Sequence, residues 1–394
     1  MSLIPKREIE SRISRLQSLL GENGVDGALI VQAVDLFYFS GTAQNGCLYL
    51  PASGNPVLWV KKSFARARDE SALENVFPLS SVKKLPELIA SGGRAPLVMG
   101  LEMDVLPANT YLFYAKMFSG TELVDISGLI KKVRQIKSGY EMEHLRVSGR
   151  KMTEVYDEIP GLIRPGITEV ALAAKIEERA RKAGHIGYMN MRAFGSAIFF
   201  GQLMSGWAAA VPSCFDGVGG GQGLHPVFPQ GCSFKTIETG EPIMVDYAGL
   251  WGGYITDRSR IYAIDYLSDK LIRAFDVSLK IQDEVIRRVE PGANGSDLFE
   301  LAFKMADKAG LGDYFMGHGS DRVKFVGHGV GLELDEFPIL AKGVDVKLEP
   351  GMVFALEPKF VFPGEGLVGI ENTFILTEKG VEKVTASPDE LVIL

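Results

Sequence analysis

Asp246 and Asp257 stand on either side of a Gly252-Gly253 pair in a stretch rich in β-forming residues. Glycine accepts the positive φ of a tight turn, so the stretch is predicted to form a β-hairpin. With Trp251-Gly252 as the turn, Asp246 lies opposite Asp257; with Gly252-Gly253 as the turn, Asp257 lies opposite Ala248 and diagonal to Asp246. In both registers the two carboxylates share a face, roughly 5–8 Å apart.

Two ionised carboxylates at that separation repel each other, so the pair needs a proton, a cation or solvent between them. The hairpin alone is also consistent with two exposed, solvated acids. The choice between these interpretations depends on what else the chain can bring to the same place.

Three further residues have metal-ligand chemistry and β-forming neighbours. His328 lies between Gly327 and Gly329, clear of neighbouring side chains. Glu357 and Glu371 are embedded in apolar strands, where an ionised glutamate is costly to bury unless it is paired or metal-bound. Antiparallel pairing brings Glu357 opposite Glu371 only across an odd-length loop or a bulge, and the intervening residues do not decide this.

A glycine-rich stretch, residues 217–223, precedes His225 and follows an apolar strand predicted at residues 197–201. It matches neither phosphate-binding fingerprint. We interpret the glycines as letting the backbone approach a bound group closely while they present His225 to it. The alternative interpretation is that His225 is an ordinary structural histidine.

The elements that must position these residues form two domains. Residues 1–130 alternate between helices and strands, including a strand expected at 27–32 and another at 36–41, which indicates an α/β domain. A basic linker is predicted at 131–138 and a second domain at 139–394. The sequence of this second domain contains an internal repeat: the spacing from Pro-Gly to Lys-Ala-Gly at residues 165–184 recurs at residues 291–310. The repeat predicts two α/β halves related by a pseudo-twofold axis, with a site between them.

Composition limits which partners and which cellular compartment the sequence predicts. Of the 394 residues, 46% are apolar and 23% charged, and the net charge of −7 gives no reason to expect nucleic acid or an anionic membrane as partner. The three cysteines are widely spaced and form no CxxC, which favours reduced thiols in a cytoplasmic protein. Residues 1–15 lack the apolar core of a signal peptide, and no apolar run is long enough to predict a membrane span.

The candidate ligands are Asp246, Asp257, His328, Glu357 and Glu371. Their four carboxylates carry a charge of −4, which two divalent cations balance. Oxygen-rich ligation with a single imidazole favours Mn²⁺, with Co²⁺, Fe²⁺ and Zn²⁺ as alternatives.

This ordered set resembles the pita-bread metallopeptidases, namely Xaa-Pro dipeptidase (prolidase), aminopeptidase P and methionine aminopeptidase, with creatinase as a metal-free relative. The first 130 residues resemble the creatinase-type N-terminal domain, which methionine aminopeptidases lack. The resemblance implies an α/β (α+β) fold in which antiparallel strands of a pita-bread catalytic domain carry the ligands. It also implies that Asp257 and Glu371 bridge two metal ions, Asp246 binds one ion, and His328 and Glu357 bind the other.

The function implied by the resemblance is hydrolysis of the peptide bond before proline by a metal-bridging hydroxide, in a cytoplasmic homodimer acting on short proline-containing peptides. Glu357 would take and return the proton, and His225 would contact the substrate carbonyl or the developing oxyanion. Asp335, where prolidases have a second histidine, would contact the substrate.

Two more positions depart from the family pattern: Gly369 replaces an arginine and Asn372 an aspartate. These changes alter the groups that orient ligands and substrate. They keep open a creatinase-like C–N hydrolase or a metal-dependent lyase on a small molecule. A non-catalytic peptide-binding module is a third hypothesis, although all five ligands are retained.

Overall fold

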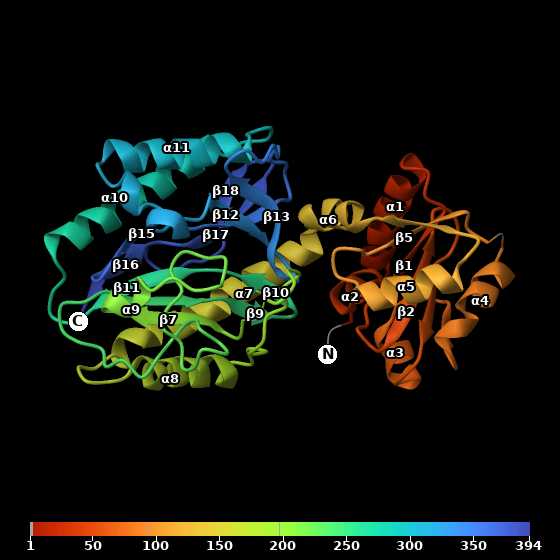
Figure 1. The fold of residues 1–394 in the computed structure, drawn as a ribbon, viewed down its shortest axis with the longest axis horizontal. Helices are drawn as coiled ribbons and strands as arrows, with labels where there is room; N and C mark the ends of the chain where they lie inside the picture. The colour runs from red at the N-terminus through yellow and green to blue at the C-terminus, as the bar shows by residue number, and fades with distance from the viewer. Residues whose placement is uncertain (1–2, 94, 197) are drawn as a thin grey trace. The chain divides into compact units, whose positions relative to one another are not determined.

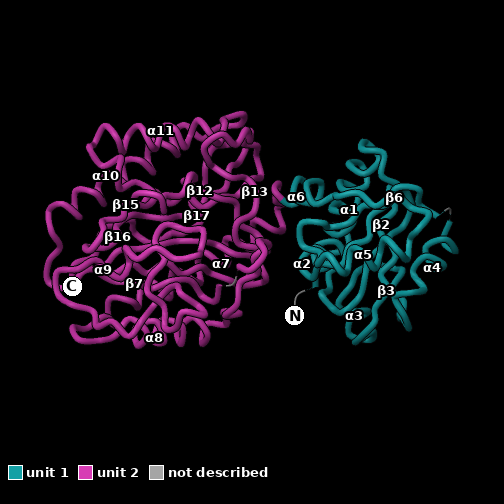
Figure 2. Tube along the Cα trace, in the orientation of Figure 1, with its two compact units in different colours: residues 1–134 teal, residues 135–394 magenta. Residues whose placement is uncertain are grey.

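The computed structural model describes residues 3–93, 95–196 and 198–394, and the chain divides into two compact units, residues 1–134 and 135–394 (Figure 2). The division falls inside the predicted linker. Helix α6 (Ser127–Gln135) runs across it, so Lys131, Lys132 and Arg134 are helical, whereas Lys137 lies between α6 and the next helix. No helix in the described part of the chain is long and apolar enough to cross a membrane. Cys47, Cys214 and Cys232 are free thiols.

The N-terminal unit contains a mixed six-stranded sheet in the order β4-β3-β2-β1-β5-β6. Its strands are β1 (Gly27–Ile30), β2 (Gly46–Pro51), β3 (Val57–Val60), β4 (Val76–Pro78), β5 (Val98–Leu101) and β6 (Glu122–Asp125). Its other helices are α1 (Lys6–Glu22), α2 (Ala33–Ser40), α3 (Phe64–Glu70), α4 (Leu85–Ser91) and α5 (Ala108–Met117).

The strand expected at 36–41 is wrong, because these residues belong to α2. The Gln32 side chain caps the helix by accepting from the Asp35 N–H, and Gly41 ends it with φ 82°. Asp35 is buried and pairs with Arg134 at 2.6 Å. Capping and this ion pair outweigh the β propensity of the aromatic run.

The C-terminal unit is built from two similar halves (Figure 1). In the first half, α7 (Gly139–Glu158) and α8 (Glu169–Lys182) pack beside the sheet β19-β11-β8-β7. In the second, α10 (Asp269–Arg288) and α11 (Gly295–Lys308) pack beside the sheet β13-β12-β14-β17-β18. Both ends of α11 lie 126 residues after those of α8, which confirms the predicted repeat.

The other elements of this unit are strands, the short helix α9 (Gly206–Ala209) and the 3-10 turns η2 (Ile159–Gly161), η3 (Gly312–Tyr314) and η4 (Gly319–Asp321). The first half contains β7 (Gly201–Ser205), β8 (Ile243–Tyr247), β9 (Gly249–Trp251), β10 (Tyr254–Thr256) and β11 (Ser259–Ala263), and its sheet is completed by the C-terminal strand β19 (Val392–Ile393). The second contains β12 (Phe325–Val330), β13 (Leu334–Ala341), β14 (Val353–Leu356), β15 (Lys359–Phe362), β16 (Gly366–Gly369), β17 (Asn372–Thr377) and β18 (Gly380–Lys383).

The run expected as a strand at 197–201 forms only an isolated bridge, between Ile198 and Met189, and β7 begins at Gly201. Residue 197 lies outside the described residues.

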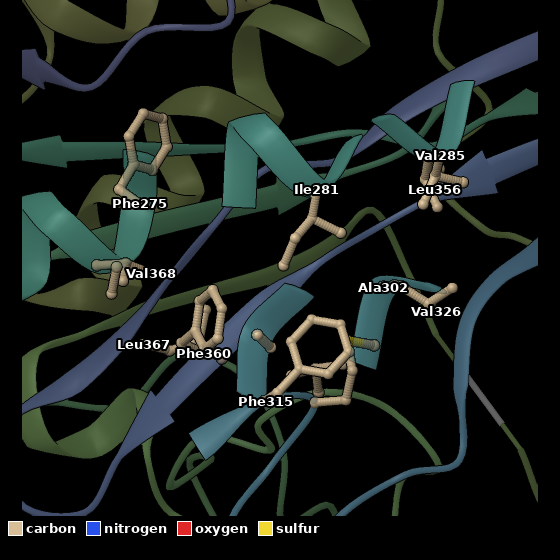
Figure 3. Packing of buried hydrophobic residues seen from close by; sticks show 14 of the residues in the cluster. Phe275, Ile281, Val285, Ala302, Phe315, Val326, Leu356, Phe360, Leu367 and Val368 are labelled. Carbon is tan, nitrogen blue, oxygen red and sulfur yellow. The ribbon is translucent and has the colours of Figure 1, made fainter. Parts of the chain in front are cut away.

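The unit has two apolar cores: one lies around α7 and α8, and the larger one lies around α10 and α11 and also takes in side chains of β7, β8 and β11. On α10 the buried side chains recur at helical spacing, from Leu271 through Phe275 and Ile281 to Val285. They pack against β12, β14, β15 and β16 in the cluster drawn in Figure 3. The ligand-bearing strands lie between the helix pairs of the two halves (Figure 1).

The Asp246–Asp257 segment is a hairpin with Gly252-Gly253 as its turn, because Trp251 pairs with Tyr254. The same register continues into β8 and β11, where Asp246 pairs with Ser259. This is the second of the two predicted registers, in which Asp257 is diagonal to Asp246.

The two halves are tied together directly behind the hairpin. Ser259 forms an isolated bridge with Glu371. The Asp257 N–H donates to the Thr373 hydroxyl at 2.7 Å, and that hydroxyl donates to the Asp257 carbonyl at 2.8 Å. All of these groups are buried, so one threonine fixes the position of Asp257 relative to β17.

Replacing Thr373 with valine should lower the free energy of unfolding by about 1–3 kcal/mol, because a buried N–H and a buried C=O lose their partner. Chemical denaturation of the metal-free protein measures this. Thr377→Val is the matched control: its hydroxyl donates to Gly380 at an exposed turn, where water can replace it. Equal losses in the two variants would contradict the proposed role of Thr373.

Candidate metal centre

The five predicted ligands come from five places in the C-terminal unit. Asp246 is on β8, and Asp257 connects β10 to β11. His328 is on β12, Glu357 directly follows β14, and Glu371 directly precedes β17. The pairing β12–β14–β17 sets the last three side by side, and the Ser259–Glu371 bridge brings the hairpin to them.

The glycines around His328 serve backbone packing. A Cβ at Gly327 would lie 2.4 Å from the Ala355 carbonyl oxygen, and one at Gly329 would lie 2.3 Å from that of Phe337. Glycine therefore lets β12 pack tightly between β13 and β14, and this close packing holds His328 at the centre of the sheet.

His328 faces three of the predicted acidic ligands. Its Nε2 lies 3.7 Å from Glu357 Oε1, 3.8 Å from Glu371 Oε1 and 3.9 Å from Asp257 Oδ2. Two ligands of one ion, each at about 2.0–2.2 Å, can be no more than about 4.4 Å apart. Asp257, His328 and Glu371 each offer one ligand atom, and the three atoms lie within 4.8 Å of one another. This group fits one divalent ion.

Burial disfavours the ionised form of the acids in the cluster. It raises the pKa of Asp257 well above its usual range, with the neighbouring carboxylates of Glu371 and Asp246 adding to the effect. It also raises the pKa of Asp246 to about 7 despite the opposing influence of Lys359. Burial acts the same way on Glu371, but Lys359 and His328 outweigh it and hold the pKa of Glu371 at about 2. The cluster therefore depends on nearby positive charge.

Lys359 is a site residue that the sequence analysis missed. Its Nζ donates to Glu371 Oε2 at 2.7 Å, Glu357 Oε2 at 2.8 Å and Asp246 Oδ2 at 2.9 Å. Burial lowers the pKa of Lys359, but these carboxylates raise it well above its usual value. One signal in the sequence could have found it: Lys359 stands two residues after Glu357 in an otherwise apolar segment, at the spacing that puts two strand side chains on one face.

Asp335 lies against the other side of the histidine. Its Oδ1 is 3.2 Å from His328 Nδ1. Nδ1 also lies 3.2 Å from the Gly329 carbonyl oxygen, which accepts its hydrogen bond. A proton held on Nδ1 by these two oxygens leaves Nε2 free to bind on the side of the buried acids. Asp335 also lines the cavity described next, so its predicted contact with substrate stays a prediction.

The cluster is reached from a cavity of about 990 Å³. The cavity and the small pocket around the ligands share six lining residues: Phe215, Asp216, Gly217, Phe325, His328 and Asp335. His225 lines neither space; it is exposed, and its Nδ1 accepts from the Val227 N–H. The structure thus brings the five predicted ligands and Asp335 together, without His225.

Strands from two similar halves that converge on buried carboxylates and one histidine define an α/β protein with a buried group able to hold a metal ion. Comparison with known proteins identifies the family. Residues 143–378 match the family model described as "Metallopeptidase family M24", and residues 12–136 match the model described as "Creatinase/Prolidase N-terminal domain".

Similarity extends over the full chain. An uncharacterized peptidase of Bacillus subtilis, YqhT, is 28% identical over 388 residues, covering 97% of this chain and 100% of that protein. The Xaa-Pro dipeptidase of Pyrococcus furiosus is 27% identical over 386 residues, covering 98% and 100%. The solved structure of a Xaa-Pro dipeptidase from Bacillus anthracis superposes with a TM-score of 0.84 at 27% identity, covering 98% of this chain and 100% of that one.

The chain belongs to metallopeptidase family M24, with a creatinase/prolidase N-terminal domain ahead of a pita-bread catalytic domain. This confirms the predicted family and fold class. The family is one of hydrolases, and a buried Asp-His-Glu group able to hold a metal ion stands where the catalytic domain matches.

Removing the Asp335 carboxylate should lower the affinity for Mn²⁺ by about 10–100-fold, because the His328 ring loses the negative charge beside Nδ1 and keeps only the Gly329 carbonyl there. Isothermal titration calorimetry of Asp335→Ala against the parent protein measures the change. Asp335→Asn keeps a polar oxygen beside Nδ1, so its loss should be smaller. An unchanged affinity in Asp335→Ala would show that His328 is held in place without this contact.

Proposed function

We propose that this chain is a metal-dependent peptidase that cleaves the bond before proline in short peptides, as a Xaa-Pro dipeptidase or an aminopeptidase P-like enzyme. The observation that carries the proposal is the group of Glu357, Glu371 and Asp257 oxygens within 3.7–3.9 Å of His328 Nε2, next to a peptide-sized cavity. Similarity over the full length to proteins described as Xaa-Pro dipeptidases supports the substrate class.

In this proposal Asp257, His328, Glu357 and Glu371 hold the metal. When bound, the metal lowers the pKa of water and polarises the scissile carbonyl. Asp335 and the Gly329 carbonyl both lie 3.2 Å from His328 Nδ1 and keep the ring in the orientation that points Nε2 inward. Lys359 fixes Glu357 and Glu371 by one oxygen each, so that their other oxygens stay directed at His328.

Glu357 is the group suited to moving a proton. Burial raises its pKa, and Lys359 opposes the rise only in part. A carboxylate with a raised pKa accepts a proton more readily at neutral pH than an exposed one. Oε2 is bonded to Lys359 and Oε1 faces the histidine side. The Glu357 carboxylate would take the proton and return it to the leaving amine.

The cavity lining suits a short peptide with charged ends. Arg322, Lys324 and Lys342 line it and can meet a carboxylate. Asp216 and Asp335, near the ligands, can meet an amino group. Opposite charges at separate positions select a short substrate carrying both termini.

The further predictions follow from the ligand set and the resemblance. The four carboxylates by themselves predict two divalent ions, with Mn²⁺ preferred. Lys359 adds a positive charge to the same site, so the number of ions is reconsidered below. A homodimer, the cytoplasm as compartment and a contact between His225 and substrate stay predictions.

The Mn²⁺-loaded protein should release the residue before proline from Xaa-Pro di- or tripeptides at least about 10-fold faster than from the matching Xaa-Ala peptides. Product release followed by chromatography measures both rates. Glu357→Gln, purified identically, should lose about 10²–10⁴-fold in rate and so controls for contaminating peptidases. A fully metal-loaded protein that cleaves no Xaa-Pro peptide would contradict the proposal and favour the C–N hydrolase or lyase hypothesis.

A further inference from the structure

Three of the five candidate ligands already hold a cation that belongs to the chain. Lys359 Nζ lies 2.7–2.9 Å from one oxygen each of Glu371, Glu357 and Asp246. The lysine side chain is only 2% exposed, so no bulk water competes for these contacts. Such short contacts between a buried ammonium and three carboxylates are charge-assisted hydrogen bonds, which are stronger than neutral ones.

The two glutamates divide their oxygens between two sides of the site. Their Oε2 atoms face Lys359, and their Oε1 atoms face His328 Nε2 at 3.7 and 3.8 Å. Asp246 is bonded to the lysine, whereas Asp257 Oδ2 lies 3.9 Å from the histidine. The ligand set therefore has an ammonium side next to Asp246 and a metal side next to His328.

The ammonium side does not fit a second divalent ion. An ion bound to the same oxygens of Asp246, Glu357 and Glu371 would compete with Lys359 for their lone pairs. It would also place a double positive charge within a few ångströms of the ammonium, at a site where burial leaves little screening.

Lys359 is held in place by the strand that carries it. Side chains alternate along β15, so the next residue, Phe360, points to the opposite face. Phe360 belongs to the apolar cluster in Figure 3 and packs against Phe315 with ring centroids 5.4 Å apart. The Lys359 carbonyl accepts from the Met316 N–H at 2.9 Å. Turning the lysine away from the acids would require moving this strand out of its core.

Gly369 makes room for the lysine. It pairs with Lys359 across β15 and β16. A Cβ at Gly369 would lie 2.6 Å from Lys359 Cα and 2.7 Å from its Cγ, distances at which the lysine would have to shift. The glycine that departs from the family pattern and the inward lysine are therefore two parts of one arrangement.

We propose that Lys359 takes the place of one metal ion, so that this chain binds a single divalent cation between Asp257, His328, Glu357 and Glu371. Asp246 then serves as a partner of the lysine instead of a metal ligand. The inference rests on the proposed metal-dependent function for the remaining ion, and it changes the predicted pair of ions to one ion and one ammonium.

Metal content of the full-length protein tests the proposal without reference to activity. After saturation with Mn²⁺ and removal of free metal, inductively coupled plasma mass spectrometry should find one Mn²⁺ per chain in the parent protein. Asp246→Ala should keep that one ion. Lys359→Ala should bind two, and the Lys359→Ala/Asp246→Ala double variant should return to one, because the vacated position needs the Asp246 carboxylate.

Lys137→Ala is the matched control. Lys137 is equally buried and pairs with Glu336 at 3.0 Å, but it touches none of the five candidate ligands through that ion pair. This variant should retain one Mn²⁺, which separates the loss of the Lys359 ammonium from the loss of a buried lysine in general.

Two ions, or none, in the parent protein would overturn the proposal, and this measurement needs no variant to fold. A folded Lys359→Ala protein with a single ion would overturn it as well. Crystals soaked in Mn²⁺ should show one anomalous peak, beside His328; a second peak beside Asp246 is the contrary result. One ion without Xaa-Pro cleavage would remove only the proposed function, whereas cleavage with two ions would remove only this inference.

Discussion

Four carboxylates with little access to water can remain together only if positive charge is built into the same space. Glu371 shows how closely the two are matched. One of its oxygens accepts from Lys359 and the other faces His328, and its pKa is held at about 2 although it is buried. Asp257, farther from the lysine, has its pKa raised well above the usual range. The lysine neutralises the side of the cluster next to Asp246, so an added cation is needed on the other side, next to Asp257 and His328.

The fold supplies this cluster from two half-structures. The first half contributes Asp246 and Asp257, and the second contributes His328, Glu357 and Glu371. The first sheet buries some side chains against α7 and α8, and other side chains of β7, β8 and β11 join the core around α10 and α11. The acids sit where the two sheets meet, fixed by the Ser259–Glu371 bridge and the Thr373 hydroxyl. Two helix pairs, and a core that residues of both halves share, thus provide a rigid frame for charges that repel each other.

Asp335, Gly369 and Asn372, the positions expected to depart from the family pattern, lie around the ligands together with Lys359. Lys359 and Gly369 pair across β15 and β16, and Asp335 contacts the nitrogen of His328 that points away from the acids. Asn372 bonds to Arg260 and Thr385 behind Glu371. These residues all surround the ligands. They alter the charge and the orientation of the site while the five ligand types remain the same.

The sequence by itself determined the two-domain α/β organisation, the internal repeat, the glycine turn of the hairpin and the five residues that converge. These features follow from local rules: apolar periodicity, turn chemistry, and the cost of burying an ionised residue in an apolar strand. Local rules failed at residues 36–41, where capping and the buried Asp35–Arg134 pair produced a helix.

Only the tertiary structure decided which oxygen of each glutamate faces the histidine and which faces Lys359. Side-chain parity places Lys359 on the same face as Glu357, but the sequence does not state that β15 and β16 bring Gly369 against the lysine and leave it no other direction. The charge balance of the site depends on that packing. A count of carboxylates in the sequence therefore predicts two metal ions, whereas the packed strands leave a position for one.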